Sequence, residues 1–191
     1  MNIPKNYHAI LEETKSLGFT MSSDMLTCQL LKTLAASKPN GKFLELGTGT
    51  GLATAWILDG MNSGASLVSI DNKKEFISVA EKHLGADSRL LLACMDGGEW
   101  LAKHATEQFD YIFADTWHGK YLMLDETLAM LKEGGFYIID DMLPQPNWHE
   151  GHDQKVEKLM ETLANRNDLT ITQQNWASGI VIVVKKSGIH N

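Results

Sequence analysis

Apolar runs alternate with amphipathic stretches along most of this chain. Five apolar runs have the length of buried strands, at 43–46, 66–70, 89–94, 109–114 and 136–139. Amphipathic stretches with helical spacing lie at 3–17, 22–37, 52–58, 73–84, 99–104, 121–131 and 152–165. Two later runs, at 169–174 and 180–184, have the pattern of a closing hairpin.

The regular alternation of strands and helices indicates an α/β fold in which helices connect parallel strands. We predict a doubly wound, mostly parallel seven-stranded sheet of Rossmann-like type, with two leading helices and a C-terminal antiparallel hairpin. The leading helices, within residues 1–40, are expected to pack on a core formed by residues 41–191. A chain of 191 residues is then expected to fold as a single domain.

Composition limits the classes of partner. The net charge is −7 and lysines and arginines are scattered, which argues against nucleic-acid substrates because binding them requires neutralisation of phosphates. The longest apolar run, 179–184, is too short to cross a bilayer, and the polar start is unlike a signal peptide. Cys28 and Cys94 indicate neither a disulfide framework nor a thiolate zinc site. We expect a cytoplasmic protein without a membrane partner.

A glycine-rich loop follows the first predicted strand, with Glu45 before it and glycines at 47, 49 and 51. Glycines let the main chain approach a ligand closely, and the N–H groups at the start of the next helix face that ligand. The dinucleotide fingerprint G-x-G-x-x-G does not fit this spacing, and the Lys-Ser/Thr of a P-loop is missing. Pyrophosphate binding is therefore disfavoured.

This acidic-x-Gly-x-Gly-x-Gly pattern closely resembles motif I of the class I methyltransferases, which use S-adenosylmethionine. The resemblance implies that the loop passes under the amino acid part of the cofactor, with Glu45 at the cationic end of the site. It assigns a group of loop residues to cofactor binding: Glu45, Gly47, Thr48, Gly49 and Gly51.

Acidic residues end each of the five predicted parallel strands: Glu45, Asp71, Asp96, Asp115 and the pair Asp140–Asp141. The carboxyl ends of such strands meet at one edge of the sheet, where ligands bind, although any one carboxylate is as well explained by a turn or helix cap. The resemblance places Asp71, with Asn72, on the ribose. It places Met95, Asp96 and Gly97 beside the adenine, while Asp96 is equally a candidate cap for the following helix.

The segment 115–121 has the pattern Asp-x-Trp-x-x-x-Tyr, which resembles the catechol O-methyltransferase branch and its bacterial relatives. In that branch, aspartates at this position and after the next strand bind one divalent metal. Carried over, the ligands of Mg²⁺ or a similar cation are Asp115, Asp140 and Asp141, although Asp141 departs from the family's asparagine. Asp115 is assigned to the cofactor and to catalysis as well.

Two further residues of this segment have expected roles. His118 stands where the branch has a lysine base, so it is our candidate general base, with an exposed loop histidine as the alternative. Trp117 matches a family tryptophan that lies along the adenine. Farther on, Trp148, His149 and His152 are candidates for a lid over the acceptor, and Trp176 for another wall.

These patterns together predict an enzyme that transfers a methyl group from S-adenosylmethionine to a hydroxyl of a small, aromatic acceptor, with help from a divalent metal. No Asn/Asp-Pro-Pro-Tyr motif follows the fourth strand, which favours oxygen over nitrogen as the acceptor. The alternatives are a metal-independent methyltransferase, a non-catalytic protein that binds S-adenosylmethionine, and a nicotinamide-dependent oxidoreductase. The leading helices are candidates for a cofactor lid and for a homodimer contact.

Overall fold

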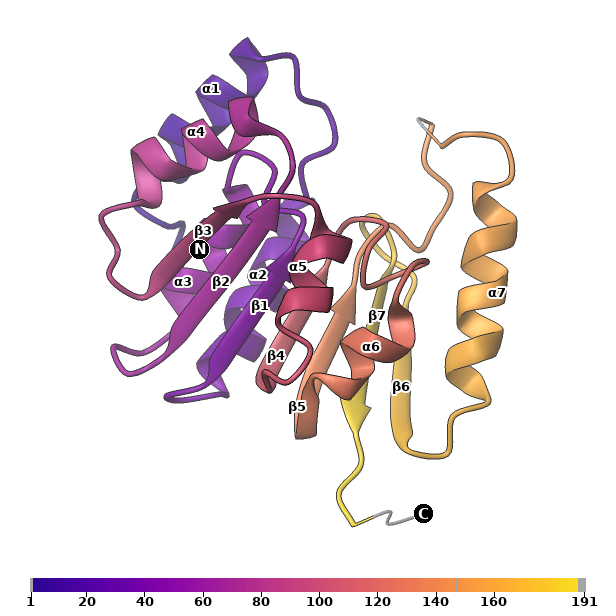
Figure 1. The fold of residues 1–191 in the computed structure, drawn as a ribbon. Helices are drawn as coiled ribbons and strands as arrows, with labels where there is room; N and C mark the ends of the chain where they lie inside the picture. The colour runs from indigo at the N-terminus through magenta and orange to yellow at the C-terminus, as the bar shows by residue number, and fades with distance from the viewer. Residues whose placement is uncertain (1, 147, 189–191) are drawn as a thin grey trace.

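The computed structural model describes residues 2–146 and 148–188. Its core is one seven-stranded sheet in the order β3-β2-β1-β4-β5-β7-β6 (Figure 1). The strands are β1 Lys42–Leu46, β2 Ser66–Asp71, β3 Leu90–Cys94, β4 Phe109–Ala114, β5 Leu131–Ile139, β6 Leu169–Gln174 and β7 Ile180–Lys185. The helices are α1 Tyr7–Ser16, α2 Met25–Ala36, α3 Leu52–Gly60, α4 Lys74–Leu84, α5 Gly97–Lys103, α6 Leu124–Ala129 and α7 His152–Ala164.

Strands β1 to β5 are parallel, and β7 runs antiparallel between β5 and β6. The predicted mostly parallel sheet with a C-terminal antiparallel hairpin is therefore confirmed. The strand order reverses between β1 and β4, because the chain leaves β1 toward β2 and β3 and then returns to the other side of β1. In open α/β sheets such a reversal opens a crevice at the carboxyl ends of the strands.

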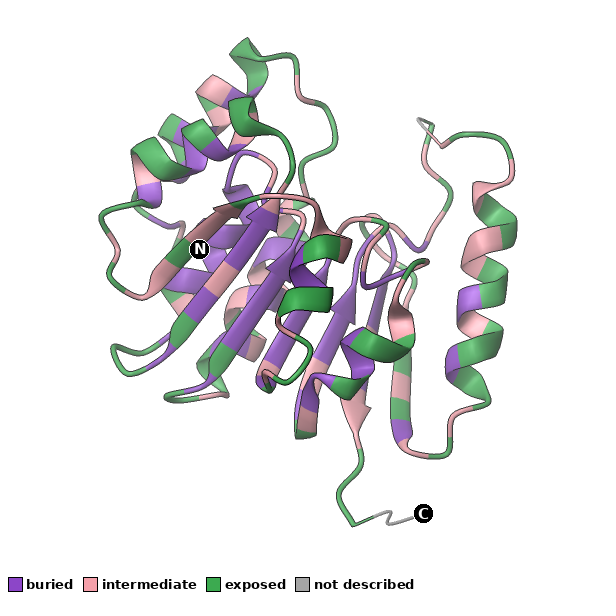
Figure 2. Ribbon diagram, viewed as in Figure 1, coloured by how far each residue is buried: buried purple, intermediate pink, exposed green. Residues whose placement is uncertain are grey.

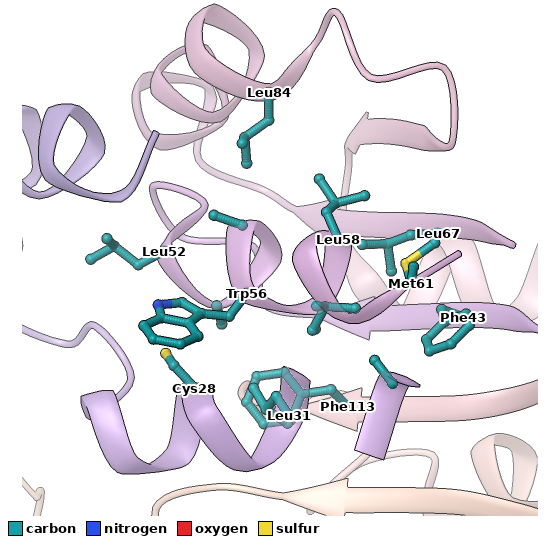
Figure 3. Close-up of a cluster of buried hydrophobic side chains, with 14 of the residues drawn as sticks. Cys28, Leu31, Phe43, Leu52, Trp56, Leu58, Met61, Leu67, Leu84 and Phe113 are labelled. Carbon is teal, nitrogen blue, oxygen red and sulfur yellow. The ribbon is translucent and has the colours of Figure 1, made fainter. Parts of the chain in front are cut away.

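Two apolar cores fill the two faces of the sheet. One contains the inner faces of α2 and α3, where Trp56, 1% exposed, packs beside Cys28 and Leu31 (Figure 3). The other contains Trp100 of α5, Leu128 of α6 and the buried leucines of α7. Figure 2 shows the central strands buried and the outer surfaces of the helices exposed. This two-sided packing holds the carboxyl ends of the strands in fixed positions.

Local bounds differ from the predicted ones mainly around α6. The expected helix over 121–131 begins only at Leu124, because residues 117–122 form a tight turn in which the N–H groups of Tyr121 and Leu122 bond the carbonyl of Trp117. The glycine pair at 134–135 lies inside β5, where the register to β4 shifts, and does not precede the strand. Asp24, one of three candidate caps, accepts from the N–H of Leu26 at the start of α2.

Within the residues that the structure describes, no helix has both the length and the apolar character needed to cross a membrane.

Candidate functional site

A cavity of about 330 Å³ lies at the carboxyl ends of β1, β2, β4 and β5. The residues that line it are Phe19, Met21, Ser22, Ser23, Gly47, Thr48, Gly49, Thr50, Leu52, Ala53, Asp71, Asn72, Lys73, Phe76, Asp115, Thr116, Trp117, Lys120, Tyr121, Asp141, Trp148, His149 and His152. Of the residues predicted for the site, the lining contains Gly47, Thr48, Gly49, Asp71, Asn72, Asp115, Trp117 and Asp141, together with the lid candidates Trp148, His149 and His152. The strand ends thus bring most of the predicted loop and aspartate positions together.

The glycine loop forms one wall of this cavity. Gly47 has φ +103°, and a Cβ there would lie 2.6 Å from the carbonyl oxygen of Asp115, which is far too close. Gly49 donates its N–H to Asp71 Oδ2 at 2.8 Å, so the loop is bonded to the end of β2. Gly51 faces away from the cavity, since its missing Cβ makes room for Ala80 of α4. The loop therefore needs glycine at 47 for its path and at 51 for helix packing.

Glu45 lies beneath this loop and not on the cavity wall. It is fully buried, and its Oε2 accepts hydrogen bonds from Thr54 Oγ1 at 2.6 Å and Ser69 Oγ at 2.5 Å. Burial raises the pKa of Glu45 to about 7. Ser69 also bonds Thr48, so the structure places Glu45 as a support of the loop through neighbouring hydroxyls.

Asp71 is held firmly at the end of β2. Its Oδ2 accepts from Gly49 and its Oδ1 from the N–H of Lys73 at 2.9 Å. Phe19 and Phe76, whose ring centroids are 4.4 Å apart, stand next to it on the cavity wall. A carboxylate beside an open cavity, with lone pairs left on both oxygens, is suited to accept hydrogen bonds from the hydroxyls of a sugar.

Of the residues predicted around the adenine, Trp117 lines the main cavity beside Tyr121, whereas Met95, Asp96 and Gly97 are not part of its lining. Asp96 caps α5, because its Oδ1 accepts from the N–H groups of Gly98 and Glu99. Gly97 and His118 line a small hollow of about 50 Å³ that also reaches Gly47 and Asp71. His118 Nδ1 lies 3.7 Å from Asp96 Oδ2. Neither Met95 nor Asp96 lines the main cavity or this small hollow.

Three aspartates and one lysine meet where β4 and β5 end. Asp115 Oδ2 accepts from Ser23 at 3.0 Å, and Asp140 Oδ1 accepts from Ser178 and from the N–H of Asp141. Burial raises the pKa of Asp115 well above its ordinary value, and the neighbouring carboxylates raise it further. Burial likewise raises the pKa of Asp140 to about 6. Lys120, 4% exposed, points into this group, where its Nζ donates to the carbonyl oxygen of Asp140 at 2.6 Å.

These residues do not fit the divalent cation that the aspartate pattern suggested. Across 2–146 and 148–188, the structure holds no group of three His, Cys, Asp or Glu side chains arranged for a metal ion. The Asp140 carboxylate is turned toward Ser178 and the main chain, and an ammonium group already supplies positive charge among the three carboxylates. A divalent cation placed among these carboxylates would be repelled by the ammonium group. The arrangement therefore gives no support to Mg²⁺ on Asp115, Asp140 and Asp141.

His118 is also placed differently from the expectation. It faces Asp96 and Gly98 on the small hollow, whereas the lysine two residues later points into the aspartate group. The tight turn of 117–122 causes this, because it directs residues 118 and 120 to different sides. Of the two, Lys120 is therefore the basic side chain on the main cavity.

An aromatic cluster forms the outer wall, from Trp117, Tyr121, Trp148 and His152. The rings of Trp148 and His152 stack with centroids 4.3 Å apart, and Tyr121 Oη lies 3.0 Å from His152 Nε2. Trp117 meets Tyr121 and His152 edge to face. Burial lowers the pKa of His152, which favours the neutral ring. The segment before α7 and the turn after β4 are thus joined over the cavity. Trp176 lies outside this lining and bonds Gln174 instead.

Sequence reasoning missed Lys120, Phe19 and Phe76. Lys120 had a signal, since it stands within the same polar segment as Asp115 and His118. The two phenylalanines had none: Phe76 lies in the first turns of α4, and Phe19 reaches the cavity because α1 packs near the loop. That packing is visible in the 2.7 Å hydrogen bond between Thr14 of α1 and Thr50.

Known proteins that resemble this chain are methyltransferases, as the fold and the glycine loop indicate. Residues 44–142 match the family model described as a methyltransferase domain. A Mycobacterium ulcerans protein, assigned by its name to the O-methyltransferases, is 24% identical over 168 residues, which are 82% of this chain and 74% of that protein. Two further mycobacterial relatives are matched over about half of their own length.

Two solved structures are similar over nearly the whole chain. The Bacillus cereus O-methyltransferase in complex with SAH superposes with a TM-score of 0.84 at 17% identity and covers 97% of this chain and 93% of that one. TomG of Streptomyces achromogenes, an O-methyltransferase in complex with SAM, has a TM-score of 0.82 at 19% identity, with coverage of 97% and 92%. At this identity the likeness establishes a common fold.

The fold and the glycine loop define a class I methyltransferase, as the loop motif indicated. This chain belongs to the methyltransferase domain family. The match begins within β1 and ends just after β5. It leaves out two parts of the cavity wall, the segment between α1 and α2 and the segment before α7 with His152.

Proposed function

We propose that this protein transfers the methyl group of S-adenosylmethionine to a hydroxyl oxygen of a small aromatic acceptor. The observation that carries the proposal is a single cavity whose two ends have different chemistry. One end has the glycine loop and Asp71, which suit a nucleoside, and the other has Trp117, Tyr121, Trp148 and His152, which suit a planar ring.

The charges around the cavity fit a cationic donor. Asp71, Asp115 and Asp141 line it, and carboxylates in a partly buried site favour a positively charged ligand. When bound, S-adenosylmethionine supplies a methyl group on a positively charged sulfur. The acceptor oxygen bonds to that carbon while the carbon–sulfur bond breaks, its electron pair stays on sulfur, and the acceptor's proton leaves to water.

The chain's own contribution is mainly alignment. The loop and Asp71 fix the donor end, while the aromatic cluster fixes the plane of the acceptor. Holding the reacting atoms in line supplies up to about 7–11 kcal/mol in favourable cases. The names of the relatives support an oxygen acceptor, because those compared here are called O-methyltransferases.

Labelled S-adenosylmethionine tests this function directly. The protein would be incubated with a panel of phenols, catechols and aromatic amines, and the products examined by mass spectrometry. Label in a methyl ether supports the proposal. Label only on nitrogen, or turnover of none of these acceptors despite bound S-adenosylhomocysteine, contradicts it.

A further inference from the structure

Lys120 is a lysine buried in the interior among acidic groups. Only 4% of it is exposed, and lysines are almost never this buried unless their charge is compensated. Its Nζ lies 2.6 Å from the carbonyl oxygen of Asp140, at the point where β5 ends. It lines the main cavity between the donor end and the aromatic cluster. A basic group in this position is accessible to a molecule bound in the cavity.

Burial lowers the pKa of Lys120, and the three neighbouring aspartates offset part of that effect without forming an ion pair with it. The charges of Asp115, Asp141 and Asp140 each favour the ammonium form. Yet among the described residues no carboxylate oxygen lies within 4.0 Å of Lys120 Nζ. An ammonium has three N–H donors, and the bond to Asp140 uses one. The others are available to an oxygen in the cavity.

The same three aspartates are the positions at which the catechol-type pattern expects a divalent cation. Here their arrangement does not form a metal site, and a tethered ammonium stands among them. We propose that Lys120 takes the place of that cation, so that this enzyme holds the acceptor's oxygen with a built-in positive charge and needs no added metal. The proposal rests on the proposed function.

The step that Lys120 assists is binding and orientation. Its ammonium donates a hydrogen bond to the acceptor oxygen and keeps a lone pair of that oxygen directed at the methyl donor. Lys120 acts here as a hydrogen-bond donor and takes no proton from the acceptor, whose proton leaves to water. The single charge of an ammonium polarises the acceptor oxygen less than a divalent ion would. Alignment of the acceptor with the methyl donor therefore supplies a larger part of the rate of methyl transfer.

Binding of Mn²⁺ tests the proposal without any acceptor. Mn²⁺ would be titrated into the wild type, Lys120→Ala and Lys120→Ala/Asp141→Asn, with electron paramagnetic resonance measuring the unbound ion. Lys158→Ala, which removes an exposed lysine of α7, is the matched control. We expect no site in the wild type or the control. In Lys120→Ala we expect one new site, because without the ammonium the carboxylates repel one another and Asp140 turns from Ser178 to share a cation with Asp115 and Asp141. The double variant should lose that site.

The rate of methyl transfer provides a second, independent test. We expect EDTA to leave wild-type activity unchanged. Lys120→Ala should lose about 100-fold in kcat, as when one preorganised hydrogen-bond donor is removed. Mn²⁺ should restore part of the activity of this variant. Propylammonium should also rescue it in part, which a purely structural role would not allow.

Several results would overturn the proposal. One is an Mn²⁺ site in the wild type that Asp141→Asn abolishes. Another is wild-type activity that EDTA removes and Mg²⁺ restores. The third is a folded Lys120→Ala variant that gains no Mn²⁺ site. If Lys120→Ala does not fold, Lys120→Met keeps the apolar stem, and the wild-type titration decides alone. Failure to bind S-adenosylhomocysteine would instead contradict the proposed function, so the two failures are distinguishable.

Discussion

Glu45 shows how one buried carboxyl can support a ligand-binding loop without touching the ligand. Its Oε2 accepts from two hydroxyls, and its Oε1 has no partner among the described residues. An ionised carboxylate in such a place is costly, which is why burial raises the pKa of Glu45 to about 7 from an ordinary 4.5. The group is therefore a source of pH-dependent stability at the base of the site.

Glu45→Gln should stabilise the protein at high pH. Because the folded pKa lies above the unfolded one, the native state binds the proton more tightly, and the wild type loses stability as pH rises from about 4.5 to about 7. The glutamine variant lacks this loss, so its advantage should grow across that window to at most about 3 kcal/mol at pH 8. Urea unfolding at pH 5 and pH 8 measures it. The exposed Glu133→Gln serves as the control, and a constant difference across pH would contradict the assignment.

Among the elements, the loop between β1 and α3 depends on glycine for two separable reasons, conformation and space. Gly47 and Gly134 both have positive φ, but a Cβ at Gly47 meets the backbone of Asp115 at 2.6 Å, whereas one at Gly134 meets nothing within 4 Å. The two positions therefore differ only in what surrounds them and in whether they face the cavity.

Gly47→Ala should abolish cofactor binding, while Gly134→Ala should not. Both substitutions lose about 1–2 kcal/mol of stability from the left-handed conformation, and Gly47→Ala loses more because the loop must move away from Asp115. Urea unfolding and calorimetric titration with S-adenosylhomocysteine separate the two effects. Equal affinity in both variants would show that the loop does not form the cofactor site.

The segment before α7 acts on the other end of the cavity. Trp148 stacks on His152, which in turn lies within hydrogen-bond distance of Tyr121, so these elements form one wall. Trp148→Ala should raise the KM for the aromatic acceptor about tenfold or more, since aromatic pairs contribute about 0.5–1.5 kcal/mol beyond the area that they bury. Affinity for S-adenosylhomocysteine should stay unchanged.

Trp176→Ala is the matched control for this wall, because Trp176 lies outside the cavity lining. Steady-state kinetics with both substrates varied would measure the effect. A KM increase of the same size in both variants would assign the loss to general destabilisation.

At the scale of the whole molecule, the reversal of strand order beside β1 determines where the site forms. The hydrophobic periodicity predicted the strands of the sheet, because it depends on local sequence. The glycines and aspartates that follow those strands predicted the loop and the position of Asp71 and Asp115, because the carboxyl ends of parallel strands meet at one edge. The sequence singled out His118 as the candidate base and did not single out Lys120, since a turn of six residues decides which of the two side chains lines the main cavity. It also could not find Phe19, whose position depends on the packing of α1.

The structure does not support the metal expectation, for a related reason. A motif counts carboxylates along the chain, but it does not show that a buried lysine points among them or that Asp140 turns toward Ser178. Both features depend on the tertiary structure, which the motif does not describe.

The central claim is that the cavity at the carboxyl ends of β1, β2, β4 and β5 binds a sulfonium nucleoside. Isothermal titration of the protein with S-adenosylhomocysteine, in parallel with NAD, tests it most directly, with Gly47→Ala as the blocked control. The account predicts saturable binding of S-adenosylhomocysteine to the wild type, none to the control, and no comparable binding of NAD. Tight binding of NAD without binding of S-adenosylhomocysteine would contradict it.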